Sequence, residues 1–381
     1  MNRYIYTFIC LCLAATCEAR IINVDDDGPA DFNNIQAAID DANDGDIIIV
    51  QQGLYKESIN FLGKNITLTS TNPANPNVIA ATIIIYNDDP IYPAVTFRGT
   101  EGPNCALIGF DIKGYIKGFD REVFPNGENH THATISHCLL CGICGGIWAC
   151  DGEISNCLLV DNNACAVASE PPTISGCHGL IKNCTIVNNR NGPGIKVWGG
   201  VTTVVNSIIY QNSWNYWAQV KIGNGGTINI SYCDIQGGLQ GIYVEDPGNS
   251  TVNWGPGNID ADPYFAQEGR WDYNQPWTYF EGDYHLKSQA GRWDADEGRW
   301  TKDEVTSLCI DAGDPHSPIG LEPFPNSGII NMGAYGGTAE ACKSYFGEPP
   351  CETIVGGDIN GDCKVDLRDF ALMAFHWLEE H

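Results

Sequence analysis

The sequence predicts an all-β fold, a solenoid of stacked coils called a parallel β-helix. One six-residue phrase returns five times between Ala133 and Asp246, with cysteine or serine at its fourth position; the copies are Ile135–Leu140, Ile154–Leu159, Ile181–Ile186, Val204–Ile209 and Ile230–Ile235. The fourth positions are 19, 27, 23 and 26 residues apart, and such a loose period is typical of stacked repeats. Each repeat has room for a strand, a turn and a second strand, but for no helix. Because one coil cannot bury its inner face alone, neighbouring coils must supply the core.

Asparagines recur in register with these phrases. Asn162, Asn189 and Asn212 each lie five residues after the cysteine or serine. Stacked at one turn, their side-chain amides could bond from coil to coil. Asparagine also favours turns in general, but three in register favour a ladder.

The cysteines of the phrases, Cys138, Cys157, Cys184 and Cys233, share one repeat position. This predicts an interior stack of unpaired thiols, where a small apolar side chain is needed. Two alternatives stay open. An exported chain permits disulfides, and the cysteines at 138, 141, 144 and 150 have a spacing similar to that of an iron-sulfur or zinc site.

Residues 1–19 have the features of a secretory signal peptide. Arg3 supplies a positive charge, an apolar stretch follows from Tyr6 to Thr16, and Ala19 ends a small-residue cleavage site. A lipid anchor on Cys17 is the alternative, but Thr16 is a poor residue before a lipidated cysteine. A membrane span needs roughly 20 apolar residues, and no other stretch of the sequence comes close. We therefore predict a secreted protein with no transmembrane segment.

The charge of the chain restricts its partners. It carries 47 acidic against 20 basic residues, a net charge of −27. Such a surface repels nucleic acid and anionic membranes and attracts cations. This fits an extracellular setting that contains calcium.

The first elements of the predicted solenoid are a short helix and three strands. Apolar residues at helical spacing predict a helix within 32–42, with Asp31 or Asn33 as its N-cap. Strands follow at Ile47–Val50, Gly53–Tyr55 and Ile66–Leu68. A helix laid over the open N-terminal end would cover the exposed core there.

This opening run resembles the pectin lyase-like superfamily of right-handed parallel β-helix proteins. The resemblance rests on Ile35–Ile39, Gly45–Val50, Gly53–Glu57 and Gly63–Leu68, and it extends over about residues 21–340. It implies the fold. It does not choose an activity, because that superfamily contains lyases, hydrolases, esterases, epimerases and proteins without enzymatic activity.

A strand after each turn places one file of side chains on the outside. The four strands are Ile147–Cys150, Ile195–Trp198, Val220–Gly223 and Ile242–Glu245. Alternation puts their Ile, Ala and Val residues inward and the residues between them outward. The predicted first file is Trp148, Lys196, Lys221 and Tyr243, and the second is Cys150, Trp198, Gly223 and Glu245. Aromatic faces stack on sugar rings and lysines neutralise uronate carboxylates, so the files predict a polysaccharide-binding surface.

Two chemistries are open on this surface. β-Elimination needs a base and a group that neutralises the uronate; Lys196 or Lys221 could serve as either, with Arg190 or Tyr243 as a helper. Glycoside hydrolysis needs two carboxylates roughly 5 to 9.5 Å apart, and the candidates are Asp151, Glu170 and Glu245.

Other observations favour neither chemistry. The sequence lacks the arginine-proline-arginine segment of pectate lyases and the paired-aspartate and Gly-His-Gly motifs of polygalacturonases. The named residues could also be ordinary solvent-facing residues of a sheet. His130, His132 and His137 cluster in the sequence; the first two lie in a predicted loop, where they could be incidental or bind a metal.

Residues 249–340 depart from the repeat. Four stretches in this segment, Gly257–Phe265, Asp283–Leu286, Cys309–Pro315 and Asn331–Gly337, resemble the C-terminal segment of many exported bacterial β-helix proteins. Gly-Arg-Trp occurs three times, ending at Trp271, Trp293 and Trp300. Arginine and tryptophan can stack on each other or on sugar. We expect this segment to form a loop and cap on the last coils, so that the β-helix with its cap occupies 20–346, followed by a linker at 347–352.

The remaining module, 353–381, contains calcium-loop spacing. Side-chain oxygens occupy loop positions 1, 3, 5, 9 and 12, and a backbone carbonyl is expected at position 7; the residues are Asp358, Asn360, Asp362, Asp366, Asp369 and, at position 7, Lys364. A helix follows, with Leu367, Phe370, Ala374 and Trp377 on one face. The module resembles a dockerin repeat, which implies calcium as a cofactor and a cohesin-like scaffold as a partner. Cys363 replaces the usual glycine, and only one loop is present where a full dockerin has two.

Two classes of function follow from the sequence. The first is an exported protein that binds or degrades an acidic polysaccharide in the manner of a pectate lyase. The second is a non-catalytic extracellular or cell-surface β-helix protein attached through the dockerin-like module.

Overall fold

The computed structural model describes residues 19–87, 92–119, 129–143, 145–163, 173–190, 192–212, 218–271, 279–345, 357, 359 and 365–377. Residues 1–18 of the predicted signal peptide and the linker at 347–352 lie outside these ranges. No helix in the described part is long and apolar enough to cross a membrane.

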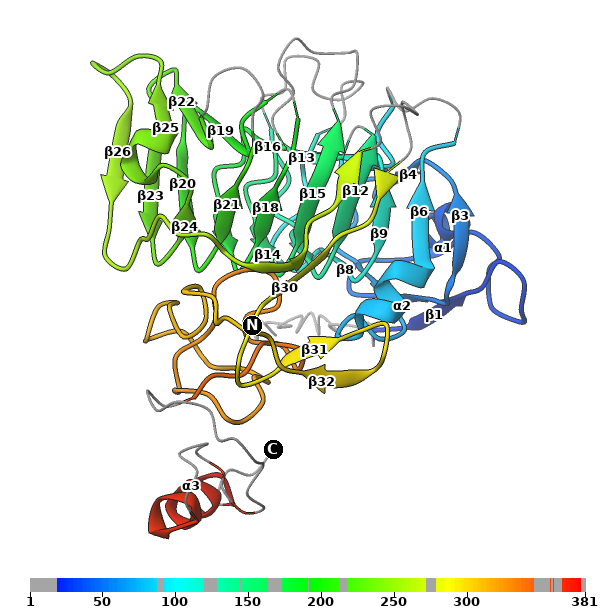
Figure 1. Cartoon of the computed structure of the whole chain (residues 1–381). Coiled ribbons are helices and arrows are strands. Elements are labelled where there is room, and N and C mark those ends of the chain that lie inside the picture. Colours follow the sequence, from blue (N-terminus) through cyan, green and yellow to red (C-terminus); the bar gives the residue numbers. More distant parts are fainter. Residues whose placement is uncertain are drawn as a thin grey trace, which may run out of the picture.

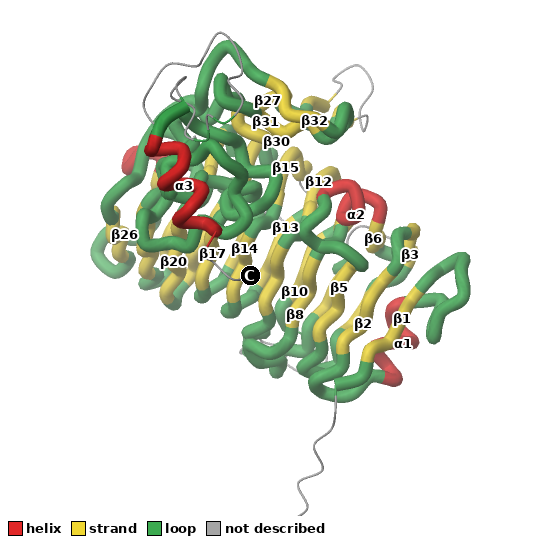
Figure 2. The backbone as a smooth tube through the Cα atoms, turned by 90° about the horizontal axis from the view of Figure 1, so that it is seen from below, coloured by secondary structure: helices red, strands yellow, loops and turns green. Residues whose placement is uncertain are grey.

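The chain winds through three parallel sheets, visiting each in turn, and the strands stack as successive rungs (Figures 1 and 2). Sheet A contains β1 (Ile21–Val24), β2 (Ile47–Val50), β5 (Thr67–Ser70), β8 (Ala106–Ile108), β11 (Thr134–Ser136), β14 (Glu153–Ser155), β17 (Leu180–Lys182), β20 (Val201–Val205), β23 (Thr227–Ser231) and β26 (Thr251–Trp254). Sheet B contains β3 (Gly53–Lys56), β6 (Thr82–Ile85), β9 (Asp111–Lys113), β12 (Leu139–Ile143), β15 (Leu158–Asn163), β18 (Thr185–Val187), β21 (Ile208–Tyr210) and β24 (Asp234–Ile235). Sheet C contains β4 (Ile59–Asn60), β7 (Val95–Thr96), β10 (Tyr115–Lys117), β13 (Gly146–Trp148), β16 (Ile174–Ser175), β19 (Ile195–Trp198), β22 (Val220–Gly223) and β25 (Ile242–Val244). The predicted parallel β-helix is confirmed.

The repeated phrase sets the register of two sheets. Its first residues pair from strand to strand in sheet A, and its last residues do the same in sheet B. The first and the last residue of every copy are buried in one continuous core. The phrase is therefore the corner between sheets A and B, with one strand on each side of it.

A stack of thiols fills this corner. The residue before each cysteine or serine is left-handed, with φ between +47° and +53°, and this turns the next side chain inward. Each cysteine thiol then donates to the carbonyl two residues earlier, with Sγ–O distances of 3.2 to 3.3 Å. Burial raises the pKa of Cys138, Cys157 and Cys233. All ten cysteines in the described part of the chain are buried and unpaired. For Cys138, Cys157, Cys184 and Cys233 this confirms the interior stack that the repeat predicts.

The predicted asparagine ladder lies where sheet B ends. Asn162 Nδ2 donates to Asn189 Oδ1 (2.9 Å), and Asn189 Nδ2 donates to Asn212 Oδ1 (2.8 Å). Asn212 Nδ2 then donates to Gln219 Oε1 (3.0 Å), which extends the ladder by one residue. The same three amides also donate to backbone carbonyls of sheet B at 2.7 to 2.9 Å. The ladder is confirmed, and it satisfies a buried bend.

Helix α1 (Ile35–Asp41) packs against β1, β2 and β4 and buries Ile35, Ala38 and Ile39. Its N-cap is Asn34, whose Oδ1 accepts from the Ala37 N–H at 2.8 Å, so the predicted caps Asp31 and Asn33 are wrong. Ile35 is the first residue of the helix and the first on its buried face. The N-cap must therefore be the residue directly before it, Asn34. That the helix shields the end of the solenoid stays a prediction. Two shorter helices are α2 (Pro76–Ala81) and η1 (Gly238–Gly241).

The C-terminal segment runs back along the outer face of sheet B (Figure 1). It forms three antiparallel pairs: β27 (Phe265–Gln267) with β30 (Asp283–Leu286), β28 (Arg270–Trp271) with β29 (Tyr279–Phe280), and β31 (Arg292–Asp294) with β32 (Arg299–Thr301). Its apolar side chains pack on outward-facing residues from β12 to β21; the cluster includes Phe265, Tyr284, Leu286, Cys309 and Met332 on one side and Cys141, Val160, Val187 and Ile208 on the other. We expected a cap on the last coils. The segment extends over the middle coils as well, because the outward residues of sheet B there are apolar and require cover.

Candidate functional site

The predicted outward file exists on sheet C. Trp148, Lys196, Lys221 and Tyr243 share one register position. The structure adds Ser175 between Trp148 and Lys196, and Lys117 before Trp148. We call these six residues the sheet C strip. The sequence missed Ser175 because its strand has only two residues.

Each lysine at the centre of the strip lies beside an aromatic ring. Lys196 Nζ is 4.7 Å from the ring centroid of Trp198, and Lys221 Nζ is 5.8 Å from that of Tyr243. Lys221 also lies 3.8 Å from a carboxylate oxygen of Glu245. Within the described ranges Lys196 forms no ion pair. The strip therefore places aromatic faces and one cation without a carboxylate partner side by side.

The second predicted file is only partly correct. Trp198 and Gly223 are register partners, and a side chain at Gly223 would come within 3.0 Å of Glu245 and 3.1 Å of Trp198. Glycine thus allows Trp198 and Glu245 to approach each other. The predicted outward position of Cys150 is wrong. This residue is fully buried, and its Sγ donates to the Ala133 carbonyl at 3.4 Å. Ala149 is left-handed (φ +58°), which breaks the alternation and turns Cys150 inward.

The other candidates do not belong to the strip, or they lie outside the described residues. Arg190 follows the asparagine ladder, and its N–H donates to the Asn162 carbonyl at 2.8 Å. Asp151 and Glu245 belong to coils four strands apart in sheet C, a separation of roughly 19 Å at about 4.8 Å per strand. They cannot form the carboxylate pair of a glycoside hydrolase. Glu170 lies outside the described ranges.

Asp151 is held by two histidines instead. Its Oδ1 lies 3.0 Å from His130 Nδ1 and 3.4 Å from His178 Nδ1, and it accepts from the His178 backbone N–H at 2.9 Å. Burial alone would raise the pKa of Asp151, but the hydrogen bonds from both histidines outweigh burial and hold that pKa well below its usual range. The hydrogen bond with Asp151 raises the pKa of His178. Of the three histidines that cluster in the sequence, only His130 belongs to this group; His178 was not predicted.

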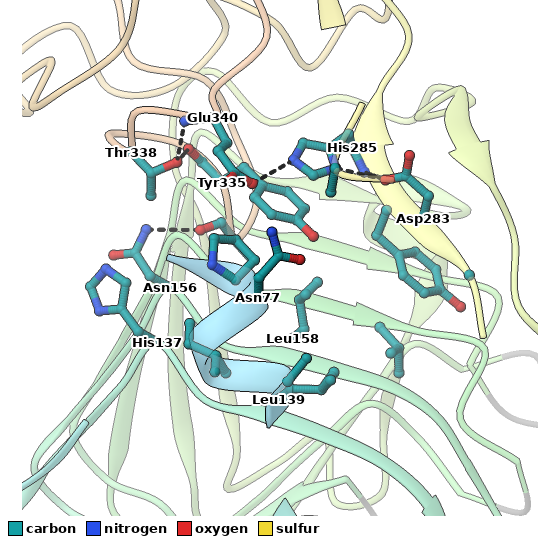
Figure 3. Close-up of a pocket in the computed structure, with 18 of the residues that line it drawn as sticks. Asn77, His137, Leu139, Asn156, Leu158, Asp283, His285, Tyr335, Thr338 and Glu340 are labelled. Carbon is teal, nitrogen blue, oxygen red and sulfur yellow. Dashed lines mark hydrogen bonds and ion pairs between the residues drawn. The ribbon is translucent and has the colours of Figure 1, made fainter. Parts of the chain in front are cut away.

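A cavity of about 450 Å³ lies between sheet B, helix α2 and the C-terminal segment (Figure 3). Leu139 and Leu158 line it from the sheet, and Asn77 from the helix. Its acidic lining comes mainly from the C-terminal segment and includes Glu281, Asp283, Asp294, Asp296 and Glu340. The sequence did not predict this cavity, because its walls come from segments about 200 residues apart that share no motif.

His285 lies at one wall of the cavity, between two carboxylates. Its Nδ1 is 2.6 Å from Asp283 and its Nε2 is 3.2 Å from Glu340, while the ring stacks on Tyr335 with centroids 3.7 Å apart. Burial opposes protonation of His285, but its hydrogen bonds to both carboxylates outweigh burial and raise its pKa.

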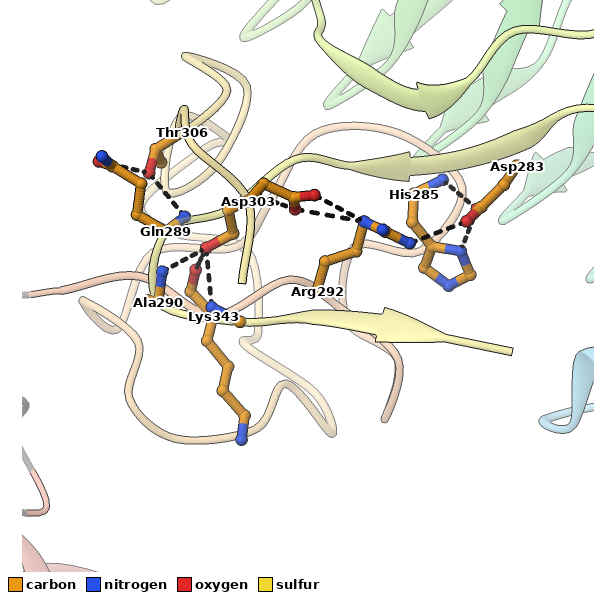
Figure 4. A network of polar contacts seen from close by, with 10 residues as sticks. Asp283, His285, Gln289, Ala290, Arg292, Asp303, Thr306 and Lys343 are labelled. Carbon is orange, nitrogen blue, oxygen red and sulfur yellow. Dashed lines mark hydrogen bonds and ion pairs between the residues drawn. The ribbon is translucent and has the colours of Figure 1, made fainter. Parts of the chain in front are cut away.

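Two of the Gly-Arg-Trp repeats make contacts within the C-terminal segment, and Figure 4 shows those of Arg292, which belongs to the second repeat. Arg292 binds Asp283 at 3.0 Å and Asp303 at 3.2 Å. Trp293 and Trp300 pack edge to face with centroids 5.5 Å apart. The second and third repeats therefore hold the C-terminal segment together.

The predicted calcium loop lies largely outside the described residues, which exclude Asp358, Asn360, Asp362 and Lys364. Asp366 and Asp369 are described. The buried Asp369 carboxylate accepts from the N–H groups of Ile359 (2.7 Å) and Asp366 (2.8 Å). Helix α3 (Leu367–Trp377) begins directly after Asp366, whose carboxylate accepts from the Arg368 N–H at 2.7 Å. The predicted helix is present, whereas calcium binding by the loop stays a prediction.

Comparison with known proteins agrees with the class of fold that the strands define. A family model described as a right handed beta helix region matches residues 141–253, and the fold is a right-handed parallel β-helix. No curated protein matches the chain. Similar solved structures include a pectin methylesterase from Aspergillus niger (13% identity, 65% of this chain and 88% of that one, TM-score 0.41), pectate lyase Pel9A (13%, 83% and 96%, 0.43) and a pectin methylesterase from carrot (13%, 65% and 85%, 0.39).

Proposed function

We propose that this protein is exported and binds an acidic polysaccharide along the sheet C strip. One observation carries the proposal. In a chain of net charge −27, three lysines lie in one outward file, Lys117, Lys196 and Lys221. Cations aligned in this way on an acidic protein favour a linear polyanion as the ligand.

The arrangement of the strip suits a sugar polymer that carries carboxylates. Tyr243 in the strip is 51% exposed and Trp198 in the neighbouring file is 44% exposed, so their faces can stack on sugar rings. Successive positions of the strip are about 4.8 Å apart, and a polymer laid along the solenoid axis would meet them one after another. The lysines would neutralise its carboxylates.

The test is binding to polygalacturonate, with a neutral glucan as the second ligand. We expect the double variant Lys196→Ala, Lys221→Ala to bind polygalacturonate roughly 10-fold more weakly, on the basis of about 1 kcal/mol or less for each exposed ion pair. The matched control is Lys182→Ala, Lys302→Ala, which removes the same charge from residues outside the strip. An equal loss in both variants, or equal binding of the neutral glucan, would contradict the proposal.

β-Elimination on the same surface is a second candidate, because no carboxylate among the described residues pairs with Lys196, whereas Lys221 lies beside Glu245. In such a reaction Lys196 would be the base and Lys221 would neutralise the uronate. The test is the ultraviolet absorbance of unsaturated product, measured with wild-type protein and Lys196→Ala. If polygalacturonate binds and neither unsaturated product nor reducing ends form, the protein is a binding protein.

We further propose that the C-terminal module binds calcium and attaches the protein to a cohesin-like scaffold. The loop spacing supports this, together with the two hydrogen bonds by which Asp369 closes the loop onto helix α3. Calcium titration of the whole chain should show a site that Asp362→Asn weakens at least about 10-fold. Unchanged calcium affinity would contradict it.

A further inference from the structure

Three residues from three successive coils meet beside the sheet C strip. His130 follows the coil of β10, Asp151 follows β13 and His178 follows β16. Asp151 and His178 each lie three residues after a member of the strip, Trp148 and Ser175. We propose that His130, Asp151 and His178 form a site for a divalent transition metal, with Zn²⁺ as the best fit.

The three ligand atoms have the separation that zinc requires. His130, Asp151 and His178 each offer one ligand atom within 4.8 Å of the other two, and Asp151 Oδ1 lies 3.0 Å from His130 Nδ1 and 3.4 Å from His178 Nδ1. A tetrahedral ion with bonds of about 2.0 to 2.1 Å separates its ligands by about 3.3 Å. An ion therefore fits between these atoms with little movement of the backbone.

The fold holds the three side chains in place before any ion binds. Asp151 is fixed by its N–H, which donates to the Thr131 carbonyl at 2.8 Å. The rings of His130 and His178 stack with centroids 5.3 Å apart. Gly200 in the next coil is left-handed (φ +61°), and a side chain there would come within 2.4 Å of the His178 ring. The site thus depends on four coils keeping their register.

The ligand set selects the kind of ion. Two imidazoles and one carboxylate suit zinc and its neighbours in the first transition row, whereas calcium prefers oxygen ligands alone. The three side chains are each about one-fifth exposed, so a fourth position can be taken by water or by an oxygen of a ligand. This site is separate from the calcium loop in residues and in chemistry, and it does not depend on glycan binding.

The test is the zinc content and affinity of the whole chain. The chain is loaded with Zn²⁺, dialysed against calcium-containing buffer and analysed by mass spectrometry of the metal. We expect one tightly held Zn²⁺ in the wild type. Loss of one ligand in His130→Gln, Asp151→Asn or His178→Gln should weaken Zn²⁺ binding at least about 100-fold. Removing even a group that only orients a metal ligand typically lowers metal affinity about 10- to 100-fold.

The control and a second readout separate this site from its alternatives. His132→Gln changes an exposed histidine two residues from His130 and should retain the ion. Bound Co²⁺ should give intense visible absorption in the wild type that Asp151→Asn removes. A wild type that holds no zinc would show that the three residues form only a hydrogen-bonded group. Zinc that survives in all three ligand variants would place it elsewhere on the chain. Either result would overturn the proposal, and thermal unfolding of each variant shows whether it has folded.

Discussion

The outer faces of sheets B and C are built by the same repeat but have opposite chemistry. On sheet B the outward positions hold Val160, Val187 and Ile208, which the C-terminal segment buries to 2% exposure or less. On sheet C the outward positions hold lysines, Trp148 and the half-exposed Tyr243.

Alternation along a strand therefore shows which residues face out, but not whether the outside is open. That information lies in the kind of residue that faces out. An apolar outward file predicts that another segment covers the face, whereas a file of cations and aromatic rings predicts an open surface. The variants below test this contrast.

The largest effect is expected from placing a charge under the covered face. Val187→Asp should lower the free energy of unfolding by about 3 to 5 kcal/mol, the cost of an uncompensated buried charge. The matched change on the open face is Ser175→Asp, which should stay within about 0.5 kcal/mol. Denaturant unfolding measures both, and similar losses in the two variants would show that the faces do not differ as described.

A somewhat smaller effect should follow from cutting the asparagine ladder at the end of sheet B. Asn189→Ala removes the partner of Asn162, of Asn212 and of the Leu159 carbonyl, all buried. Because a buried polar group without a partner costs about 1 to 3 kcal/mol, we expect a loss of about 2 to 4 kcal/mol in denaturant unfolding. Asn253→Ala is the control, since its hydrogen bond to Asn229 is exposed, and it should cost well under 1 kcal/mol.

The covered face should also make stability depend on pH. The pKa of His285 is raised in the folded protein, so its contribution is fully present below the unfolded histidine pKa of about 6.5 and is lost as pH rises through the folded value. Unfolding free energies measured from pH 6 upward should therefore fall more in the wild type than in His285→Gln.

His137 should have the opposite effect on stability, because burial lowers its pKa. The wild type should lose stability as pH falls below about 6.5, and His137→Asn should remove this loss. Identical pH profiles for the wild type and both variants would contradict this assignment.

The smallest effect on stability is expected on the open face. Lys196→Ala should change the unfolding free energy by less than about 0.5 kcal/mol while weakening polygalacturonate binding about threefold, as for one exposed ion pair. Val187→Ala should do the reverse, costing about 1 to 3 kcal/mol with unchanged binding. Calorimetric titration and denaturant unfolding of the two variants separate the roles of the faces, and a binding defect in Val187→Ala would link them.

The repeating part of the fold was predictable because its interactions are periodic. The five phrases pair in the predicted register, and the cysteine stack and asparagine ladder follow from the same alignment. Errors occur where local geometry interrupts the period. The left-handed Ala149 turns Cys150 inward, and β16 is too short to show a pattern.

The sites were less predictable because they join residues without a common motif. The file through Lys196 and Lys221 came from alternation alone. His178 is brought to His130 and Asp151 only by the stacking of coils of different length. The cavity beside sheet B needs the return path of the C-terminal segment, and no periodicity specifies that path.

Labelling of the stacked thiols can show the order in which the coils of the solenoid unfold. Cys138, Cys157, Cys184 and Cys233 belong to different coils and are all closed to solvent, so a water-soluble maleimide can reach each one only after its coil has separated. Solenoids open through contacts between neighbours, and local stability differs along them. The order in which mass spectrometry finds these four cysteines labelled would give the order in which the coils come apart, without any probe being added to the chain.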